Sequence, residues 1–474
     1  MNGERNGTGA MSRTGGDLAG RSVTVMGLGL FGGGAAVSRW LVAQGALVTV
    51  TDLRSESDLA PAVRALSDLD LRWVLGEHRE DDFARADLVV ANPAVPPASP
   101  YLAAARSAGV PVTSEMALFL ERCPARIAAV TGTQGKSSTC STLAQLLEAS
   151  GFRVHLGGNI GRSLLESTSA MRDDDVAVVE ISSYQLEALP DRLGQPGSEP
   201  RVEVVAVTNV LADHIERHGS VEAYAAAKRR ILALAAASRG TAVLSAEDPR
   251  LAGWREPGVR RLDVHAQRAT GLGLDLADGS FRMDGEILGT VADLRIPGGF
   301  QRENTLIALG MARVLGADPR RLAVAIGGIR ALPHRLEDLG LRRGCRVWDN
   351  GVSTTPDSTV SALLSIDPGC TLLCGGKAKE LALEELVATA RTRVRRVVAF
   401  GAAAGRFGSA FRDGGIEASE TRTVEEAVAV AFERMLPGEE LLFSPAAASF
   451  DAYLNFRERA IAFRNFLPPL STAR

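Results

Sequence analysis

The sequence predicts an α/β protein made of three successive domains, each built on a mostly parallel sheet. Short apolar segments repeatedly end in glycine or polar residues and are followed by patterns of helical period. One glycine-rich turn spans residues 27–32, and a second of different spacing spans residues 132–135. Strands that are apolar on both faces and alternate with helices are typical of a sheet covered by helices on both sides.

Length and composition limit the class of protein. The chain has 474 residues, which suggests roughly three domains at about 100–200 residues each. Its formal net charge of −3 provides no basic field, so we expect no nucleic-acid partner. Its five cysteines form no CxxC pair, which favours a reducing, cytoplasmic compartment. No apolar run approaches the ~18 residues that span a bilayer, so we expect no membrane association.

The first domain is predicted at residues 21–124, after a flexible tail at 1–20. An apolar strand (Val23–Met26) leads into Gly27-x-Gly29-x-x-Gly32, then a helix to about Gln44, then a second strand that ends at Asp52. This βαβ pattern, with an acid 20 residues past the last glycine, is typical of a Rossmann-like dinucleotide site. The alternative is that the glycines only allow close packing of strand and helix.

The central domain, at residues 125–331, opens with "AVTGTQGKSSTC". An apolar strand precedes this stretch, and leucines at helical spacing follow it as far as Gly151. A strand, tight loop and helix in that order suit a phosphate, with Lys136 as a point charge and Ser137 as a magnesium ligand. The spacing is unusual, because the common phosphate loop has its first glycine five residues before the second, where Val130 stands here.

Polar residues follow two further apolar strands of this P-loop ATPase-like domain. Glu180 ends the strand Val176–Val179, and the next strand ends at 208–209, shortly before His214. Carboxyl ends of parallel strands meet at one edge, so Ser137, Glu180 and His214 are predicted to converge on a metal. The alternatives are that Glu180 is a strand-end carboxylate exposed to water and that His214 is an ordinary polar residue of the surface.

Two other features of the central domain have ordinary explanations. His214 and His218 are four residues apart, but no glutamate follows His214 directly, so the zinc-protease helix is not matched. Lys228 stands beside Arg229 and Arg230, which by default indicates a solvated basic face.

The third domain is predicted at residues 332–474 as another Rossmann-like open sheet. Four apolar stretches, "CRVWDNG", "CTLLCGGKAKE", "VRRVVAFG" and "EELLFSPAAASFD", indicate strands separated by helical segments. Arg335, Lys379 and Ser449 are its candidate functional residues.

Six motifs in a fixed order resemble the Mur ligase family. They are "TGTQGKSS", "EISSYQLE", "TNVLADHIERHGSVEAYAAAKRRI", "LPHRLE", "GGKAK" and "SPAAASFDAYLNFRER", and the resemblance covers about residues 22–465. The family's compact TGTNGKT loop accounts for the unusual spacing between Gly132 and Gly135.

The resemblance implies an ATP-dependent ligase that adds glutamate to UDP-N-acetylmuramoyl-L-alanine through an acyl phosphate, in cytoplasmic peptidoglycan synthesis. It implies ATP, Mg²⁺ and a carbamylated Lys228 as cofactors, and a monomer. We expect D-glutamate as substrate. A variant that adds L-glutamate is the alternative.

The resemblance also assigns site residues. The catalytic residues are Lys136, Glu180, His214 and Lys228, and the magnesium ligands are Ser137, Glu180, His214 and Lys228. ATP is expected at Gly132, Thr133, Gln134, Gly135, Lys136, Ser137, Ser138, Asn304, Arg335 and Asp349. The UDP-linked substrate is expected at Gly27, Leu28, Gly29, Asp52, Asn159, Ser182 and Ser183, and glutamate at Thr354, Lys379, Ser449 and Phe456.

The sequence departs from the family pattern in three places. Phe31 replaces a threonine, and Phe300-Gln301 replaces a His-Asn pair. The segment 350–355 reads "NGVSTT" in place of Asp-Ser-Lys-Ala-Thr-Asn, so Val352 replaces a lysine. Asp349 is the predicted substitute for the missing aspartate, and Lys377 is a candidate substitute for the missing cation.

Alternatives from other classes remain open. A nicotinamide-dependent oxidoreductase leaves the phosphate loop and the third domain unexplained. A nucleotide-dependent scaffold would bind nucleotide without any transfer. Folylpolyglutamate synthetase also adds glutamate, but it begins near its phosphate loop and lacks the "GLGLFG" domain.

Overall fold

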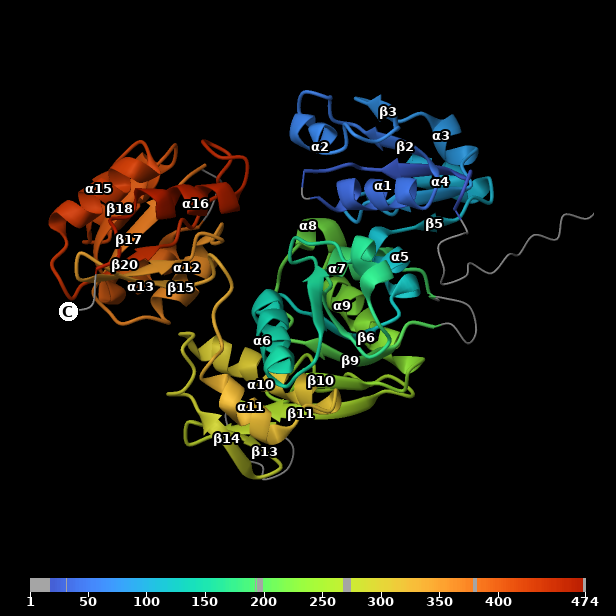
Figure 1. Cartoon of the computed structure of the whole chain (residues 1–474). Helices are drawn as coiled ribbons and strands as arrows, with labels where there is room; N and C mark the ends of the chain where they lie inside the picture. Colours follow the sequence, from blue (N-terminus) through green and yellow to red (C-terminus); the bar gives the residue numbers. More distant parts are fainter. Residues whose placement is uncertain are drawn as a thin grey trace, which may run out of the picture. The chain divides into compact units, whose positions relative to one another are not determined.

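The structure is a computed structural model of the whole chain, and it describes residues 18–30, 32–191, 193, 199–266, 274–377 and 382–471. The chain packs into two compact units. Unit 1 comprises residues 1–291 and 303–326, and unit 2 comprises residues 292–302 and 327–474. The three predicted α/β sheets are present, two in unit 1 and one in unit 2 (Figure 1).

The first sheet of unit 1 is parallel throughout and has the strand order β3-β2-β1-β4-β5. Its strands are β1 (Ser22–Met26), β2 (Leu47–Asp52), β3 (Arg72–Leu75), β4 (Leu88–Ala91) and β5 (Val112–Thr113). Its helices are α1 (Gly33–Ala43), α2 (Ala60–Arg64), α3 (Glu80–Ala84), α4 (Pro100–Ser107) and α5 (Glu115–Arg122). Leu18, within the segment predicted as a tail, is buried, and the Gly20 amide donates to the Gly45 carbonyl at 2.8 Å.

The glycine-rich turn of this sheet requires glycine for two physical reasons. Gly27 and Gly29 adopt φ values of +89° and +66°, which residues with a side chain rarely adopt. A Cβ at Gly34 would lie 2.1 Å from the Leu28 carbonyl oxygen, so α1 approaches the turn only because Gly34 has no side chain. Gly34, which lies two residues beyond the predicted pattern, therefore serves the close packing of strand and helix.

The central sheet has nine strands in the order β14-β13-β12-β11-β10-β9-β6-β8-β7. They are β6 (Arg126–Thr131), β7 (Val154–Gly158), β8 (Val176–Glu180), β9 (Val202–Val207), β10 (Thr241–Ser245), β11 (Arg260–His265), β12 (Leu274–Ala277), β13 (Ser280–Met283) and β14 (Glu286–Thr290). The strands β12, β13 and β14 pair antiparallel, and the remaining pairs are parallel. The carboxyl ends of β6, β8 and β9 therefore meet at one edge, as predicted.

Helices of several lengths connect these strands. They are α6 (Lys136–Ala149), the 3₁₀ helix η1 (Leu165–Ala170), α7 (Ser183–Ala188), α8 (Ile215–His218), α9 (Val221–Ala236), α10 (Gly299–Val314) and α11 (Pro319–Ile326). α7 begins with a capping box, in which the Ser182 hydroxyl accepts from the Gln185 amide while the Gln185 side chain accepts from the Ser182 amide.

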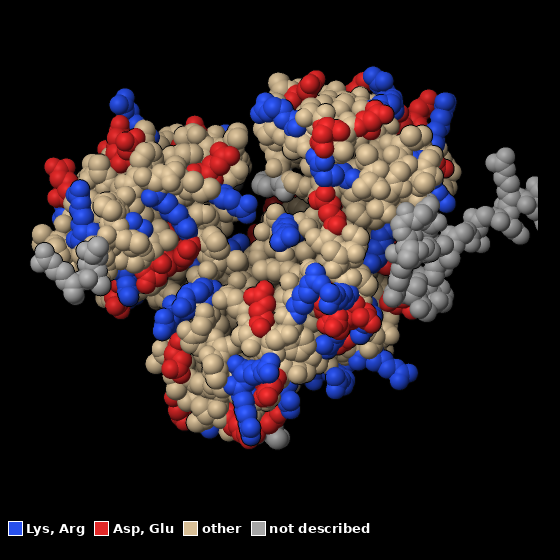
Figure 2. Space-filling view, viewed as in Figure 1, with Lys and Arg blue, Asp and Glu red and all other residues tan. Residues whose placement is uncertain are grey.

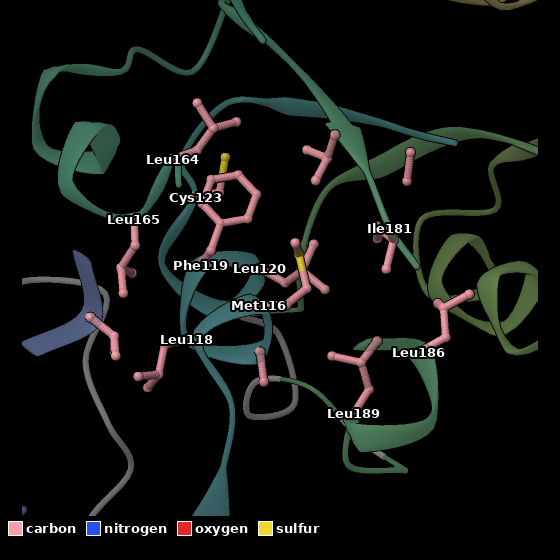
Figure 3. Packing of buried hydrophobic residues seen from close by; sticks show 14 of the residues in the cluster. Met116, Leu118, Phe119, Leu120, Cys123, Leu164, Leu165, Ile181, Leu186 and Leu189 are labelled. Atoms are coloured by element: carbon pink, nitrogen blue, oxygen red, sulfur yellow. The ribbon is translucent and has the colours of Figure 1, made fainter. Parts of the chain in front are cut away.

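One hydrophobic core runs through both sheets of unit 1. It includes Val25 of β1 and Ile127 of β6, and α5 contributes five consecutive buried residues, Met116–Leu120. Figure 3 shows the side chains of α5 packed among those of Leu164 and Leu165 and, on the other side, Ile181, Leu186 and Leu189. A helix that is apolar all round needs burial on every side. α5 therefore joins the two sheets into one compact unit.

Unit 2 holds the third sheet, with strand order β15-β16-β20-β17-β18-β19. Its strands are β15 (Glu337–Arg342), β16 (Cys345–Asp349), β17 (Cys370–Gly375), β18 (Val394–Phe400), β19 (Glu417–Glu420) and β20 (Glu440–Phe443). Its helices are α12 (Pro356–Leu363), α13 (Glu384–Arg393), α14 (Ala404–Asp413), α15 (Val424–Arg434) and α16 (Phe456–Phe466). The four predicted strands are present, and β15 and β19 are additional.

Each face of this sheet has a core of its own. Leu372 and Val397 pack with α12, α13 and α14, whereas the adjacent residues Leu373 and Val398 pack with α15 and α16. Successive residues of a strand point to opposite faces, so an uninterrupted apolar run supplies both cores at once.

The surface and the cysteines agree with the composition. Figure 2 shows basic and acidic side chains interspersed over the visible face of the molecule. All five cysteines are buried, and none of them forms a disulfide. No helix in the described part of the chain combines the length and the apolar composition that crossing a bilayer requires.

Candidate active site

The phosphate loop connects β6 to α6, and its two glycines have separate structural roles. A Cβ at Gly132 would lie 1.8 Å from the Thr208 hydroxyl oxygen, so Gly132 lets β9 approach the loop. Gly135 has φ +80° and precedes α6 in a left-handed conformation. A Cβ there would lie 2.4 Å from the Asn304 side-chain oxygen, which places the predicted nucleotide residue Asn304 against the loop.

Residues at the end of β9 hold the loop, and sequence reasoning did not assign them this role. The Thr208 hydroxyl donates to the Gln134 carbonyl at 2.5 Å, and the Asn209 side chain accepts from the Gln134 amide at 3.0 Å. The Thr133 amide donates to the Asn209 carbonyl at 2.9 Å. Their position at the end of an apolar strand was the available signal. The loop is therefore fixed from outside as well as by its own glycines.

Ser137 and Glu180 lie in contact, as predicted. The Ser137 hydroxyl donates to one oxygen of the Glu180 carboxylate at 2.5 Å, and the side-chain amide of Asn159 donates to the other oxygen at 2.7 Å. Ser137 and Glu180 are 5% and 2% exposed. Burial of a carboxylate without a cation is costly unless polar groups satisfy it. These two neutral donors orient Glu180.

Both predicted lysines bind carbonyl groups of the loop. Lys136 donates to the Thr133 carbonyl at 2.9 Å, and Lys228 donates to the Gly132 carbonyl at 2.7 Å. Lys228 is only 1% exposed, and its ammonium lies 4.3 Å from the centre of the Tyr224 ring. Burial, together with the nearby Lys136 charge, lowers the pKa of Lys228 to about 7. Lys228, a residue of α9, thus binds the phosphate loop and does not lie on a solvated basic face.

His214 lies apart from the Ser137–Glu180 pair, although it flanks the same ring as Lys228. It makes no hydrogen bond or ion pair with Ser137 or Glu180 among the described residues, and its contacts are with Asp213, Glu216 and Tyr184. Its ring centre is 6.1 Å from that of Tyr224. His214 and Lys228 are therefore both neighbours of Tyr224.

The donor set of this edge fits magnesium better than zinc. In the described part of the chain, no group of three His, Cys, Asp or Glu side chains could hold a metal. Ser137 and Glu180 offer a hydroxyl and a carboxylate, and Mg²⁺ is commonly held by one or two carboxylates with phosphate oxygens and water. The residues present fit that mode of binding, with the phosphates supplied by a nucleotide.

A cavity of about 920 Å³ lies beside the Ser137–Glu180 pair within unit 1. Six of the seven residues predicted for the UDP-linked substrate line it: Gly27, Leu28, Gly29, Asp52, Asn159 and Ser182. Asp52 accepts hydrogen bonds from the Gly29 amide at 3.2 Å and the Arg54 amide at 3.0 Å, which favours its charged form. The seventh, Ser183, is buried outside the cavity lining and contacts His218 at 3.1 Å.

Several lining residues were missed by sequence reasoning, among them Arg54, Glu115 and Ser163. Arg54 is the one Lys or Arg among the described residues that line the cavity, and it is the cation available to an anionic ligand there. Glu115 is a half-buried residue whose carboxyl accepts a hydrogen bond from Ser163, and desolvation of that carboxyl raises its pKa. Arg54 follows Asp52 by two positions, which was a usable signal. Glu115 and Ser163 had none, because they come from separate segments.

Unit 2 gives Asp349 a structural role. Asp349 is fully buried, and its carboxylate accepts from His334 at 2.7 Å, from Arg464 at 2.7 Å and from the Gly351 amide at 2.9 Å. Arg464 also pairs with Glu337. Both carboxylate oxygens are thus occupied by groups of unit 2 itself. Asp349 was predicted to contact nucleotide, and its position in this cluster favours fixing β16 instead.

Three residues predicted for glutamate lie near one buried arginine. Arg459, which is 0% exposed, donates to the carbonyls of Ser353, Gly375 and Ala447, at 3.3, 3.4 and 2.8 Å. The Gly375 carbonyl ends β17, and the other two carbonyls lie in the loops after β16 and β20. Arg459 therefore holds the loops that carry Thr354 and Ser449. Phe456 begins α16, three residues before Arg459. Sequence reasoning missed Arg459.

Other predicted residues of the chain are placed less fully. Lys379 and Phe31 lie outside the described residues. Lys377 is exposed, and its amide donates to the Ala448 carbonyl at 2.8 Å, one residue before Ser449. Arg335 is half-buried in unit 2. Ser138 is in the first turn of α6, directly after Ser137.

Comparison with known proteins identifies the family. Residues 21–114 match the model of the Mur ligase MurD-like N-terminal domain, and residues 130–312 match that of the Mur ligase middle domain. A UDP-N-acetylmuramoylalanine–D-glutamate ligase of Geobacter metallireducens is 37% identical over 96% of this chain and 99% of its own. The enzyme of that name from a Roseiflexus species is 36% identical over 95% and 99%.

Solved structures show the same fold. The UDP-N-acetylmuramate-alanine ligase MurC of Thermotoga maritima superposes with a TM-score of 0.60 at 17% identity, over 94% of this chain and 98% of its own. MurF of Acinetobacter baumannii gives 0.57 at 15% identity, over 94% and 90%. The full-length sequence relatives, with the two matching domain models, carry the assignment: the chain belongs to the Mur ligase family.

Proposed function

We propose that the chain is an ATP-dependent ligase that joins D-glutamate to UDP-N-acetylmuramoyl-L-alanine in peptidoglycan precursor synthesis. One observation carries the proposal. Asn159 lines the large cavity and donates to Glu180, which in turn accepts from Ser137 of the phosphate loop. A ligand in the cavity and a nucleotide on the loop would thus meet at Glu180. The relatives that match nearly the full chain are named for this reaction.

The chemistry follows from that meeting point. The terminal alanine carboxylate of the UDP-linked substrate attacks the ATP γ-phosphorus, the bond to ADP breaks, and an acyl phosphate forms. The glutamate amine then attacks the acyl carbon, loses a proton and displaces phosphate, which leaves a peptide bond. Both reactants of the first step are anionic, so stabilising their charge is the main catalytic requirement.

The residues of the phosphate loop have separate tasks in this step. Lys136 binds the β- and γ-phosphates, and the amides that begin α6 point at the same oxygens. Ser137 and Glu180 hold a Mg²⁺ ion, which neutralises charge on the phosphates when bound. Asn304, placed against Gly135, contacts the nucleotide. Lys136 leaves the Thr133 carbonyl, to which it donates at 2.9 Å, to reach the phosphates.

Lys228 is proposed to act as a carbamate. The ammonium first loses one proton, and the neutral amine then adds carbon dioxide and releases a second, which turns a cation into an anion that a hard metal accepts. The family motif around Lys228, and its burial beside a loop that binds anions, support this role. Its pKa of about 7 means that much of the amine is neutral at physiological pH. With the carbamate of Lys228, His214 would hold or orient a second Mg²⁺ ion, apart from the one assigned to Ser137 and Glu180.

The glutamate pocket is proposed in unit 2, at Thr354, Lys379, Ser449 and Phe456, with Arg459 fixing the loops. Lys377 is the candidate for the cation that Val352 lacks. Glutamate has two carboxylates and one amine in either hand, so selection depends on where cations and hydroxyls stand. D-glutamate is the expected substrate. Incorporation of L-glutamate would identify the altered segment 350–355 as the cause.

The proposal extends to the setting of the enzyme. All its substrates are small molecules, and the chain is proposed to act as a monomer in the cytoplasm. Five buried cysteines, none in a disulfide, are compatible with a reducing compartment. The interspersed surface charges on the visible face favour no nucleic-acid partner (Figure 2).

Phosphate release tests the proposal directly. The complete mixture contains ATP, Mg²⁺, UDP-N-acetylmuramoyl-L-alanine and D-glutamate, and one component is omitted in each control. Release is expected only from the complete mixture, with one amide formed per phosphate. Release with a folate acceptor, or a calorimetric response to NAD, would favour the folylpolyglutamate synthetase or the oxidoreductase alternative. Nucleotide binding without release would favour a scaffold.

A further inference from the structure

The loop 93–97 of the large cavity has an unusual backbone requirement. It contains three prolines, Pro93, Pro96 and Pro97, and four of its five residues, 93–96, line the cavity. Proline has no amide proton, and this loop belongs to no strand. Its carbonyl groups therefore need donors from elsewhere in the chain.

Arg217 of α8 supplies those donors. Its guanidinium donates to the carbonyls of Pro93, Ala94 and Val95, at 3.4, 3.4 and 3.2 Å. The side chain is 13% exposed, and its charge is balanced by Glu187 of α7 at 3.0 Å. A planar fork with five N–H groups can serve several acceptors at once, which the point charge of a lysine does less well.

The same arginine is joined to the turn that carries His214. The Arg217 amide donates to the His214 carbonyl at 3.1 Å. Its guanidinium lies 5.0 Å from the centre of the Tyr184 ring, and the Tyr184 hydroxyl lies 3.4 Å from His214 Nδ1. Tyr184 itself lines the large cavity. Arg217 thus touches the cavity loop on one side and the surroundings of His214 on the other.

His214 needs such support because of its backbone. It adopts φ +52°, a left-handed conformation that costs free energy for a residue with a side chain and persists only where neighbours enforce it. α8 has four residues, too few to be stable alone. Anchoring by Arg217 is therefore an important restraint on the direction of the His214 ring.

We propose that Arg217 is a positioning residue that couples occupancy of the large cavity to the placement of His214. This rests on the proposed function, because it assigns the cavity to the UDP-linked substrate. A substrate in the cavity contacts the loop 93–97, and Arg217 links that loop to the turn that carries His214. Binding of the acceptor would thereby favour the catalytic position of the His214 ring, which would limit hydrolysis of ATP in its absence.

The test compares Arg217→Lys with Arg106→Lys. Arg106 donates to the Pro97 carbonyl at 3.1 Å, on the same loop, but among the described residues it makes no hydrogen bond to α7 or α8. In Arg217→Lys, KM for UDP-N-acetylmuramoyl-L-alanine should rise and kcat should fall, each by about 10- to 100-fold, because small misplacements of reacting groups are costly. KM for ATP and for glutamate should stay near wild type, as should every constant of Arg106→Lys.

A second variant separates positioning from folding. Tyr184→Phe keeps the ring beneath Arg217 and removes the hydroxyl near His214, so its effect on kcat should be non-additive with that of Arg217→Lys. Normal kinetics for Arg217→Lys, or equal rises in all three KM values with a lowered Tm, would overturn the coupling. An inactive wild type would overturn the proposed function as well, so the two failures are distinguishable.

Discussion

The carboxyl ends of the strands carry the predicted residues in both the central sheet and the sheet of unit 2, but the two edges differ. In the central sheet Ser137 and Asn159 both donate to Glu180. In unit 2 Asp349 accepts from His334 and Arg464, and the buried Arg459 donates to carbonyls in the loops that carry Thr354 and Ser449.

The difference lies in how each edge is held. The central edge is held largely by neutral side chains, as Thr208 and Asn209 show, and the hydrogen bonds to the Glu180 carboxylate come from the neutral groups of Ser137 and Asn159. The edge of unit 2 is held by charged side chains, Arg459 and Arg464, that are occupied with its own groups. A charge at a strand end is therefore a functional candidate only when the fold has not already paired it.

The largest effect is expected at the central edge. Lys136→Ala should lower phosphate release by ~10²–10³-fold or more, because it removes a charge that acts on the transferring group. Tm and the circular dichroism spectrum verify that the variant is folded. Phosphate release at the wild-type rate would remove the loop from the mechanism.

Lys228→Arg should also be severe, with a loss of about 100-fold, because arginine keeps the positive charge but cannot form the carbamate. In the wild type, stripping dissolved carbon dioxide and bicarbonate should lower activity, and their return should restore it. Full activity of the arginine variant would refute the carbamate.

In unit 2, Asp349→Asn should lower stability and leave ATP binding unchanged, in contrast to the substitutions at the central edge. Removing one partner from a buried charged cluster should destabilise unit 2 by about 3 kcal/mol, measured by urea unfolding. KM for ATP of the folded protein should not change. A raised KM for ATP with normal stability would restore the nucleotide role and make the two edges alike.

Val352→Lys should change the selection of glutamate more than the rate. A new cation near two carboxylates is worth ~1–3 kcal/mol if the pocket excludes water. The measurement is competition between D- and L-glutamate, before and after the substitution. Preferential use of L-glutamate by the wild type would overturn the D-specific proposal. An unchanged ratio in the variant would exclude Val352 as the determinant.

The smallest effect is expected at Glu115. Desolvation raises the pKa of the Glu115 carboxyl above its ordinary value of 4.5. Between pH 4.5 and that raised pKa, the folded protein therefore binds more protons than the unfolded chain. Wild-type stability should therefore fall as pH rises from about 4.5 through the raised pKa. Glu115→Gln removes this pH dependence of stability. The Tm of the variant minus the Tm of the wild type should therefore increase from pH 4 to pH 7. The exposed Glu148→Gln should show no such trend.

The sequence alone was sufficient for the fold class, the phosphate loop and the contact between Ser137 and Glu180. These depend on local signals: apolar strands, glycines at turns, and polar residues where strands end. The motifs in order also gave the family. Six of the seven residues predicted for the UDP-linked substrate line one cavity, because they stand at the ends of neighbouring strands or in the turns beside them.

Tertiary structure decided what depends on partners distant in the chain. Asp349 accepts a hydrogen bond from Arg464, 115 positions away, and Arg217 donates to carbonyls more than 120 positions earlier. Lys228 has a lowered pKa because the fold buries it on the Gly132 carbonyl, although its neighbours in sequence are two arginines. Desolvation and pairing are properties of the space around a group, and no local pattern of residues encodes them.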